Sequence, residues 1–404
     1  MAKRKNLRIG IVGAGNRAGG LGRNLLALKG VRVTALSDPD TDRLNNLADE
    51  LGVPPENRFT DSNDLLASSC IEAVVIASPD HTHHALVLEA ARRKKHVFCE
   101  KPMALELKHC VEMQKAAHRN GIMMMMGFCL RYNNLYRKAK EMIAQGMIGR
   151  LHLAYAVDSV ERGSAYFFHS WHRLKKNSGG LLLQKATHSL DILNWMTDSE
   201  PISVYALGGL DVFGGKESNA KACGSCQRKK TCPEFIDAHR YHSDYLSGKA
   251  FVIEDKCVFA QEIDVLDNEV LAIRYANGVR ATFTECHFSP DYKREFAFVG
   301  DKGRLTIMDY YLHNGRTMPI KHPREIVLAR RHENRIITVH PKMRKGGHGG
   351  GDPAMIEDFV AALRGERKPL ATGLTGILST AIAAAAERSV ITGKVEPIDR
   401  ANGI

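Results

Sequence analysis

A lysine in this chain has a sequence context suited to proton transfer. Lys101 stands in Glu100-Lys101-Pro102, directly after the apolar run His96–Cys99. Burial lowers the pKa of an ammonium group, and a lysine with a lowered pKa exchanges protons with a hydroxyl. Pro102 restricts Lys101 to extended backbone, and the bond between them is a candidate for the cis form. The competing interpretation is an ordinary Lys-Pro turn at the surface.

A histidine further along the chain offers the same kind of chemistry. His188 lies in the stretch Gly179–Asp191, which leads into a helix containing Trp195. Near neutral pH an imidazole both takes and returns a proton, as reversible acid–base catalysis on an alcohol requires. Alternatively, His188 starts the helix and is hydrogen-bonded into the core. For an isolated histidine this second interpretation is the favoured one.

A glycine-rich turn early in the chain has the residues of a dinucleotide site. The apolar run Leu7–Val12 leads into Gly13-Ala14-Gly15 and then a helical stretch. A strand, a tight turn and a helix N-terminus in this order bind a pyrophosphate. A second apolar run is followed by Asp38, where a carboxylate accepts hydrogen bonds from both ribose hydroxyls of NAD and repels the extra phosphate of NADP. Alternatively, Asp38 caps the turn before the next proline.

The remaining contacts to NAD should come from the ends of the following strands. The runs Ile71–Ala77 and His96–Cys99 both read as buried parallel strands, and their carboxyl ends should open on the same crevice. The residues predicted to bind NAD are Gly13, Gly15, Asn16, Arg17, Asp38, Ser78, His81, His83, Glu100 and Lys101.

Aromatic and basic residues mix in a predicted loop upstream of His188. Trp171 is suited to stacking on a sugar face, and Arg173 to clamping a carboxylate, sulfonate or phosphate. Alternatively, the aromatics belong to the core and the cations face solvent. His348, in a glycine-rich loop, is a further candidate. The predicted substrate-binding residues are Arg131, Tyr132, Trp171, His172, Arg173, Gln184, Lys185 and His348.

Three of the nine cysteines are concentrated in one loop. Cys223, Cys226 and Cys232 stand in the pattern Cys-x2-Cys-x5-Cys, with Cys257 available as a fourth ligand and His239 or His242 as its substitute. Such a set holds structural zinc or, less readily, an iron–sulfur cluster. The competing interpretation is a set of reduced, partly buried thiols.

Two domains have to position these groups. The chain has 404 residues, and single cores stop growing near about 250–300 residues. The pattern predicts an α/β protein: an N-terminal Rossmann domain over residues 1–127 and a C-terminal α+β domain over 128–404. In the second domain, longer alternating strands and tight turns at Asn277-Gly278 and Asp301-Lys302-Gly303 predict a large, mostly antiparallel open sheet. The last helices are free to pack back on the Rossmann domain.

The composition limits the classes of partner that the protein is expected to bind. The formal charge is +12, but the basic residues are scattered without a nucleic-acid-binding motif, so steering of an anionic substrate or a solvated basic surface are the two interpretations. A run of about 20 apolar residues that could cross a membrane is not expected. The basic start lacks the pattern of a signal peptide, which favours the cytoplasm and reduced thiols.

In order and spacing, the glycine turn, Asp38, Ser78-Pro79 with His83, Glu100-Lys101-Pro102 and the His188 segment resemble the Gfo/Idh/MocA family (glucose-fructose oxidoreductase, inositol dehydrogenase, rhizopine catabolism). The resemblance spans essentially the whole chain. It implies NAD, a small carbohydrate substrate, Lys101 and His188 as the catalytic pair, and subunit contacts through the open sheet in a homodimer or homotetramer.

One residue departs from the family pattern. The family aspartate four positions before the histidine is Gln184 here, which orients a hydroxyl but exchanges no proton. The leading hypothesis is therefore an NAD-dependent oxidoreductase acting on a sugar or cyclitol hydroxyl. The alternative is an NAD-dependent glycosidase that oxidises a ring hydroxyl transiently, eliminates the aglycone, adds water and reduces again. A third hypothesis is a non-catalytic NAD- and sugar-sensing protein.

Overall fold

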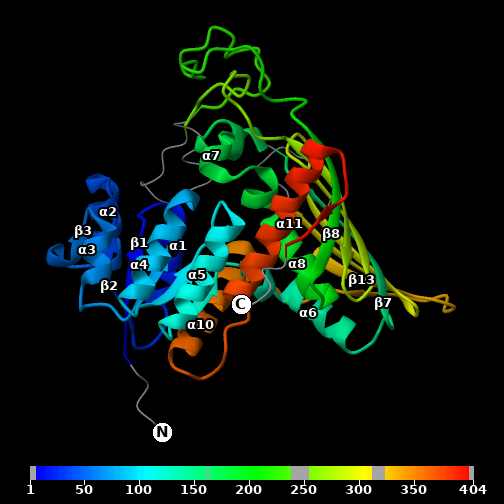
Figure 1. Ribbon diagram of the computed structural model, residues 1–404, viewed down its shortest axis with the longest axis horizontal. Coiled ribbons are helices and arrows are strands. Elements are labelled where there is room, and N and C mark those ends of the chain that lie inside the picture. Colours follow the sequence, from blue (N-terminus) through cyan, green and yellow to red (C-terminus); the bar gives the residue numbers. More distant parts are fainter. Residues whose placement is uncertain (1–5, 162, 238–253, 312–323, 400–404) are drawn as a thin grey trace.

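A computed structural model of the protein describes residues 6–161, 163–237, 254–311 and 324–399. Two sheets lie side by side, with helices between them (Figure 1). The sheet at the left is parallel and the sheet at the right is mostly antiparallel, which confirms the predicted fold class.

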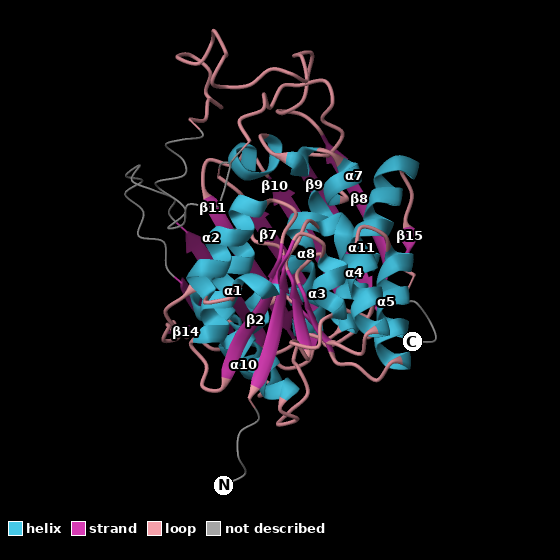
Figure 2. Ribbon diagram, turned by 90° about the vertical axis from the view of Figure 1, so that its left-hand side faces the viewer, coloured by secondary structure: helices cyan, strands magenta, loops and turns pink. Residues whose placement is uncertain are grey.

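The parallel sheet has the strand order β3-β2-β1-β4-β5-β6. Its strands read as continuous apolar runs because both faces are covered: Figure 2 shows α1, α2 and α10 on one side and α3, α4 and α5 on the other. The elements are β1 (Leu7–Val12), α1 (Asn16–Leu26), β2 (Val31–Ser37), α2 (Thr41–Leu51), β3 (Arg58–Phe59), α3 (Ser62–Ala67), β4 (Ala73–Ile76), α4 (His83–Arg92), β5 (His96–Cys99), α5 (Leu107–Arg119) and β6 (Met124–Met126).

The second sheet has the order β14-β13-β12-β11-β7-β10-β9-β8-β15. Neighbouring strands are antiparallel except β7 and β10, which are parallel. The hairpins predicted at Gly278 and Gly303 join β9 to β10 and β11 to β12. The strands are β7 (Leu151–Ser159), β8 (Pro201–Gly209), β9 (Asn268–Tyr275), β10 (Arg280–Cys286), β11 (Tyr292–Gly300), β12 (Gly303–Tyr311), β13 (Arg324–Arg330), β14 (Ile336–Val339) and β15 (Glu396–Pro397).

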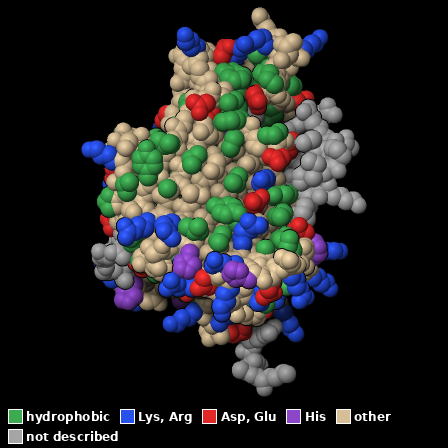
Figure 3. All heavy atoms as spheres, turned by 90° about the vertical axis from the view of Figure 1, so that its right-hand side faces the viewer, with side chains coloured by type: hydrophobic (Ala, Val, Ile, Leu, Met, Phe, Trp, Pro, Cys, Tyr) green, Lys and Arg blue, Asp and Glu red, His purple; other side chains and the backbone are tan. Residues whose placement is uncertain are grey.

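The two faces of this sheet differ in what covers them. Helices α6 (Asn134–Ala144), α8 (Thr187–Thr197) and α11 (Gly373–Thr392) pack on one face, where they share a core with alternate strand residues. The opposite face exposes Leu153 and Tyr155 on β7, Leu207 on β8 and Val270 on β9. Figure 3 looks onto this face, where hydrophobic side chains spread over the strands.

The last helices return to the first sheet. Met355 and Phe359 of α10 (Gly347–Leu363) lie in the core of the parallel sheet, and α11 packs against α5, α8 and β8. By length and composition α11 could cross a membrane, so the expectation that no such segment occurs was wrong. Since 56% of its apolar window is buried inside the molecule, α11 is accounted for as a core helix.

The loop predicted around Trp171 is a series of short helical turns. These are the π-helical turns η4 (Ser164–Phe168) and η6 (Leu182–Ala186), the 3-10 turn η5 (Trp171–Arg173) and α7 (Lys175–Ser178). The π-helical turn η6 runs directly into α8, so it fixes where His188 lies relative to the parallel sheet.

Candidate functional site

The predicted phosphate-binding turn has the required backbone. Gly13 has a φ of +97°, and a Cβ atom there would lie 2.7 Å from the main-chain oxygen of Ala77, so no larger residue fits. A Cβ on Gly15 would meet nothing within 4 Å. Gly15 caps α1 without a side-chain hydrogen bond, so the helix N-terminus is open to an anion.

Asp38 is buried beside this turn, at the end of β2. Its Oδ2 atom accepts a 2.8 Å hydrogen bond from the Ala14 amide, and Oδ1 accepts one from the Asp40 amide. The carboxylate therefore braces the glycine turn from behind. The alternative role as a mere cap of the next turn does not account for the bond to Ala14.

His83 has a different position from the one predicted. The ring is fully buried, with Nδ1 2.8 Å from the main-chain oxygen of Pro102 and Nε2 3.0 Å from that of Ser78. Both ring nitrogens are thus engaged inside the protein, and the prediction of a direct NAD contact was wrong. His83 instead holds the ends of β4 and β5 together, at the cis peptide bond between Lys101 and Pro102. Ser78 is partly exposed and His81 exposed at the same edge.

Glu100 and Arg17 form a bridge to the second domain. The Nε atom of Arg17 lies 2.6 Å from Glu100, and its Nη1 atom lies 2.9 Å from Asp352 of α10. The Glu100 carboxylate rests on Gly127, where a Cβ atom would come within 2.8 Å of it. The Arg17 guanidinium is therefore engaged in two ion pairs. Asn16, the first residue of α1, is partly exposed.

Lys101 lies where the two domains meet. Its Nζ atom donates a 2.7 Å hydrogen bond to the main-chain oxygen of Gln184. Burial lowers the pKa of Lys101, although the carboxylates of Asp80 and Glu100 favour its charged form. Burial also raises the pKa of Asp80 to about 7, against the pull of the Lys101 charge. Asp80 and Lys101 therefore form a coupled acid–base pair.

His188 is buried a short distance away, in the first turn of α8. Burial, followed by the positive charge of Lys101, lowers its pKa well below the usual range, so the imidazole is neutral. Phe128 packs edge-on against the ring at a centroid distance of 6.1 Å. A neutral imidazole can accept a proton from a hydroxyl group and give it back.

His348 faces His188, with the ring centroids 6.1 Å apart. Its Nδ1 atom lies 3.0 Å from the Asp352 carboxylate, and its main-chain oxygen accepts a hydrogen bond from Asn133. Neighbouring Cys129 and then Asp352 raise the pKa of His348, so this ring is charged where His188 is neutral. The glycine-rich loop that carries His348 therefore brings a cation to the site.

Several buried polar atoms at this place have no hydrogen-bond partner among the described residues. They are Oδ2 of Asp80, Oε1 of Gln184 and Nδ1 of His188, together with the hydroxyl of Tyr166. Buried polar groups in native proteins are almost always satisfied, so unpartnered ones at one site indicate a polar ligand. This set offers both a hydrogen-bond donor and acceptors to such a ligand.

Lys185 belongs to a polar network on the inner face of the second sheet. Its Nζ atom donates to the Tyr292 hydroxyl at 2.9 Å and lies 3.9 Å from Asp158. Asp158 also accepts hydrogen bonds from Ser189 and Arg294. Although burial opposes its charge, Asp158 raises the pKa of Lys185, which is therefore a fixed cation beside the site.

Trp171 and His172 lie near Lys101. Their rings stack at a centroid distance of 3.7 Å, and both residues are partly exposed. Burial, followed by the charge of Lys101, lowers the pKa of His172 to about 3, which places this ring within electrostatic reach of Lys101. We call the stacked rings of Trp171 and His172 the aromatic wall. Stacking of Trp171 on a sugar face stays a prediction, and this position is compatible with it.

Three other predicted substrate contacts were wrong. The Arg131 guanidinium is buried in a bidentate ion pair with Asp191, at 2.7 and 2.8 Å. The Tyr132 hydroxyl donates to the buried Asp358 carboxylate. Arg173 is 1% exposed, is paired with Glu262 and donates to the main-chain oxygen of Cys257. Among the described residues these three side chains are engaged in contacts within the protein.

Asp80 is the functional residue that sequence reasoning missed. It stands between Ser78-Pro79 and His83, at the carboxyl end of β4, beside the strand that delivers Lys101. Carboxyl ends of adjacent parallel strands meet at one sheet edge, so a carboxylate here was a signal that could have been used. Tyr166, by contrast, had no sequence signal that separated it from the neighbouring aromatics.

The cysteines of the predicted metal site lie in one pocket away from Lys101. All nine cysteines are free thiols, and the pocket is lined by Cys223, Cys226, Cys232 and Cys257, with His169 beside them. His239 and His242, the predicted substitutes, lie outside the described residues.

Three relatives are similar to this chain in sequence. A Bacillus subtilis (strain 168) protein, YteT, described as an oxidoreductase, is 28% identical over 81% of this chain and 81% of its own length. The myo-inositol 2-dehydrogenase of Thermotoga maritima is 30% identical over 50% of this chain and 59% of its own. The 2,7-anhydro-N-acetylneuraminate hydratase of Mediterraneibacter gnavus is 32% identical over 51% and 53%. The chain thus spans little more than half the length of the latter two.

Solved structures share the fold over nearly the entire chain. A levoglucosan dehydrogenase in complex with NADH superposes with a TM-score of 0.77, at 19% identity, covering 98% of this chain and 100% of that one. At this identity the likeness concerns the fold.

Family models cover both domains. The model of the NAD-binding Rossmann fold of the Gfo/Idh/MocA oxidoreductases matches residues 7–128, and the model of their C-terminal α/β domain matches residues 140–399. With the glycine turn, the Lys101 edge and the His188 segment all in place, the chain belongs to the Gfo/Idh/MocA family of NAD-binding oxidoreductases.

Proposed function

We propose that the protein oxidises or reduces a secondary hydroxyl of a sugar or cyclitol, with Lys101 and His188 as the catalytic residues. The observation that carries this proposal is the position of the Lys101 Nζ atom. It is fixed on the Gln184 carbonyl, next to the buried Asp80 carboxyl and within electrostatic reach of the neutral His188. A substrate hydroxyl placed there meets two groups that hold or release a proton.

When bound, NAD supplies the hydride acceptor and donor; the residues of this chain move the proton. In the oxidation direction the hydroxyl proton passes to the neutral His188, or to Lys101 as Lys101 hands its own proton to the Asp80 carboxylate. Gln184 and Tyr166 offer the unpartnered polar atoms that orient neighbouring hydroxyls. Without the buried His83, the proposed NAD contacts are Gly13, Gly15, Asn16, Arg17, Asp38, Ser78, His81, Glu100 and Lys101.

An anionic substrate fits the charges around the site. Lys185 and His348 bring fixed positive charge to the same place as Lys101, and the stacked Trp171 and His172 rings offer a face for a sugar. Fixed cations attract and orient a carboxylate or other anionic group on the sugar.

A specific observation favours a second candidate function, the glycosidase. Gln184 stands where the family pattern has an aspartate, and its carboxamide exchanges no proton, so the site departs from that of a simple alcohol dehydrogenase. Transient oxidation makes the neighbouring carbon acidic, which allows elimination of an aglycone, addition of water and return of the hydride. One relative that shares half of this chain is named as a hydratase, a reaction of the same elimination and addition type.

One experiment separates the two functions. The purified protein is incubated with NAD and a panel of sugars, cyclitols, sugar acids and aryl glycosides, with absorbance of NADH and released aglycone measured together. Stoichiometric NADH supports net dehydrogenation, whereas aglycone release with catalytic NAD and no accumulated NADH supports the glycosidase. NAD binding with neither product would leave the sensing role and overturn both.

Two further proposals concern the state of the protein. We infer a homodimer or homotetramer, since the apolar outer face of the second sheet is the surface that a second copy would cover. We also infer a cytoplasmic reaction, because nine free thiols suit a reducing compartment.

A further inference from the structure

The loop between β8 and β9 holds four cysteines that the reaction does not use. In its described part, 210–237 and 254–267, the backbone is tied by short β-bridges, such as the one between Ala222 and Lys256. Across that bridge the Cys223 amide donates to the main-chain oxygen of Asp255, and the Cys257 amide donates to that of Lys221. Cys223 and Cys257 are thereby held on adjoining backbone segments.

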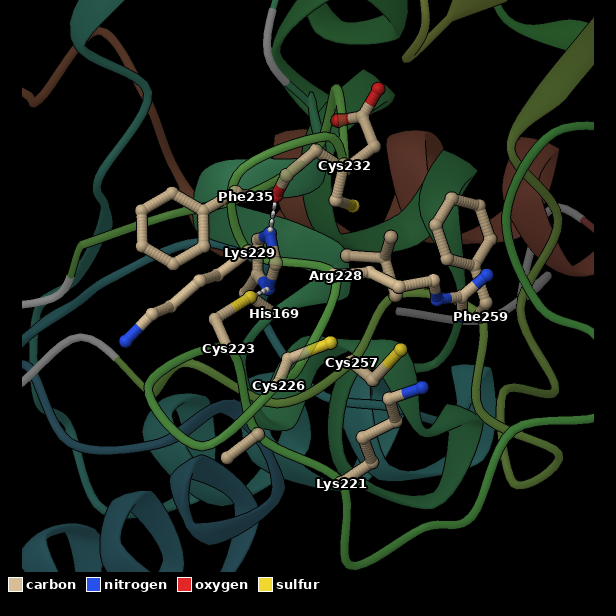
Figure 4. A pocket seen from close by; sticks show the side chains of 13 residues that line it. His169, Lys221, Cys223, Cys226, Arg228, Lys229, Cys232, Phe235, Cys257 and Phe259 are labelled. Carbon is tan, nitrogen blue, oxygen red and sulfur yellow. Dashed lines mark hydrogen bonds between the residues drawn. The ribbon is translucent and has the colours of Figure 1, made fainter.

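Tight turns bring the other two thiols to the same place. The Cys226 amide donates to the main-chain oxygen of Cys223, which closes the Cys-x2-Cys turn, and the Cys232 amide donates to that of Arg228. Figure 4 shows the side chains of all four cysteines around one pocket, with the His169 ring among them. The four sulfur-bearing side chains thus come from two segments about 25 residues apart in the chain.

The chemistry of the pocket suits a thiolate-bound metal. All four cysteines are free thiols. Lys221, Arg228 and Lys229 line the same pocket, so cationic side chains lie beside the net negative charge that a zinc ion bound to four thiolates would carry. Four thiolates in a Cys-x2-Cys-based set are typical ligands of tetrahedral Zn²⁺.

The described part of the loop packs on two small groups of buried apolar side chains. Cys223 lies with Ala165 and Ile236, and a neighbouring group of seven buried residues includes Phe213 and Val258. Small cores are often reinforced by a metal or a disulfide. The four cysteines are free thiols, which leaves them available to a metal.

Zinc binding would tighten the present arrangement. A tetrahedral site with Zn–S bonds of about 2.3 Å places its sulfurs about 3.8 Å apart. Among the described residues, the groups of three ligand atoms within 4.8 Å of one another lie elsewhere, so the four sulfurs surround the pocket more widely. Binding therefore draws the turn 223–232 and Cys257 together, and couples the metal to the order of the loop.

The cysteine loop is connected to the aromatic wall of the site. Arg173 donates to the main-chain oxygen of Cys257 at 2.9 Å. The His169 ring nitrogens lie 2.6 and 2.9 Å from the main-chain oxygens of Lys256 and Glu234. His169 and Arg173 flank the stacked pair Trp171 and His172, so the order of the loop sets the position of that wall.

We propose that Cys223, Cys226, Cys232 and Cys257 bind one structural zinc ion, which fastens the loop against the segment that carries Trp171. The first test is metal analysis of the full-length protein purified without chelators and after incubation with zinc. The expected content is about one zinc per chain. Cys226→Ser and Cys232→Ser should lose it, while Cys70→Ser, a change on the Rossmann domain, should keep it. Less than about 0.1 equivalent in the wild type, or iron with visible charge-transfer absorption, would overturn the proposal.

A second measurement avoids variants that fail to fold. In wild-type protein, a mercurial thiol reagent should release zinc to a chromophoric chelator in about the same amount as metal analysis finds. Cysteine ligands make this release thiol-dependent. Zinc that leaves with chelator alone at the same rate would mean a site without these thiols.

The fastening role has its own readout. The chain has two tryptophans, so Trp195→Phe leaves Trp171 as the single emitter. Removal of zinc from this variant should shift the emission of Trp171 to longer wavelength, and zinc addition should reverse the shift. Unchanged emission on full zinc loss would overturn the link between the metal and the aromatic wall.

Discussion

The Nζ atom of Lys101 donates a 2.7 Å hydrogen bond to the main-chain oxygen of Gln184. This bond joins the end of β5 in the parallel sheet to the turn that leads into α8 in the other domain. A main-chain oxygen does not titrate, so the contact fixes the position of the lysine without fixing its protonation state. The contact uses the main chain of residue 184 and therefore does not depend on its side chain, and in the proposed mechanism Lys101, Asp80 and His188 handle the proton.

Removing the lysine amine tests its catalytic role. Lys101→Met keeps most of the apolar stem but has no group to hold a proton, so kcat should fall by about 10²–10⁴-fold. The NAD affinity should stay within a few-fold, because the glycine turn and Asp38 are untouched. Steady-state kinetics and NAD titration check both values. Turnover within threefold of the wild type would remove Lys101 from the mechanism.

His188→Asn tests the second catalytic residue. Asparagine retains a hydrogen-bonding side chain but does not exchange a proton, so kcat should drop by about 10²-fold or more while the fold is kept. His83→Asn is the matched comparison, since that ring is bonded to two main-chain oxygens and should affect thermal stability more than the chemical step. The assignment fails if the His188 variant loses stability but keeps kcat.

The pH dependence should follow the Asp80 and Lys101 pair. Burial raises the pKa of Asp80 to about 7, so below this pH the pair carries both protons and has no room for the one leaving the substrate hydroxyl. Oxidation should therefore speed up as the pH rises through about 7. In Asp80→Asn this inflection should vanish, because the titrating carboxyl is gone. A wild-type inflection retained in the variant would assign it to another group.

Particular elements show which parts of the fold can be predicted from the sequence. β1 was expected at the bounds it has, because a parallel strand covered on both faces reads as one apolar run. The hairpin at Gly278 was expected because Asn-Gly turns favour tight antiparallel connections. Such signals are local. The apolar residues around Trp171 show neither a helical nor a strand spacing, so this segment was expected to form a loop.

The site was harder to predict, because the partner of a charged side chain is a tertiary contact. Arg131 pairs with Asp191, and Arg173 pairs with Glu262; neither partner is close in sequence. Sequence context marks an arginine near a site as a substrate clamp, and only the fold reveals that a carboxylate already occupies it. Lys101 and His188 were predicted because their neighbours form recognisable segments, and their catalytic roles stay predictions.

The buried pair of Arg131 and Asp191 gives a prediction about stability. Arg131→Met leaves the Asp191 carboxylate buried without its partner and should cost about 3–5 kcal/mol of unfolding free energy. The double variant with Asp191→Leu should recover much of this loss, because neither charge remains. Urea unfolding measures both. If Arg131 were a substrate clamp instead, the single variant would raise KM with little change in stability.

The outer face of the second sheet gives the last prediction. Leu207 on β8 and Val270 on β9 are cross-strand neighbours, with 58% and 48% of their surfaces exposed. Monomeric proteins seldom expose such a patch over several strands, and a second copy of the sheet would bury it. Leu207→Glu places a charge on this face and should shift the protein to monomers, as measured by light scattering after size exclusion. Leu374, 45% exposed on α11, gives the matched control, because Leu374→Glu adds the same charge away from this face. An unchanged mass for Leu207→Glu, or a monomeric wild type, would rule out this face as the subunit contact.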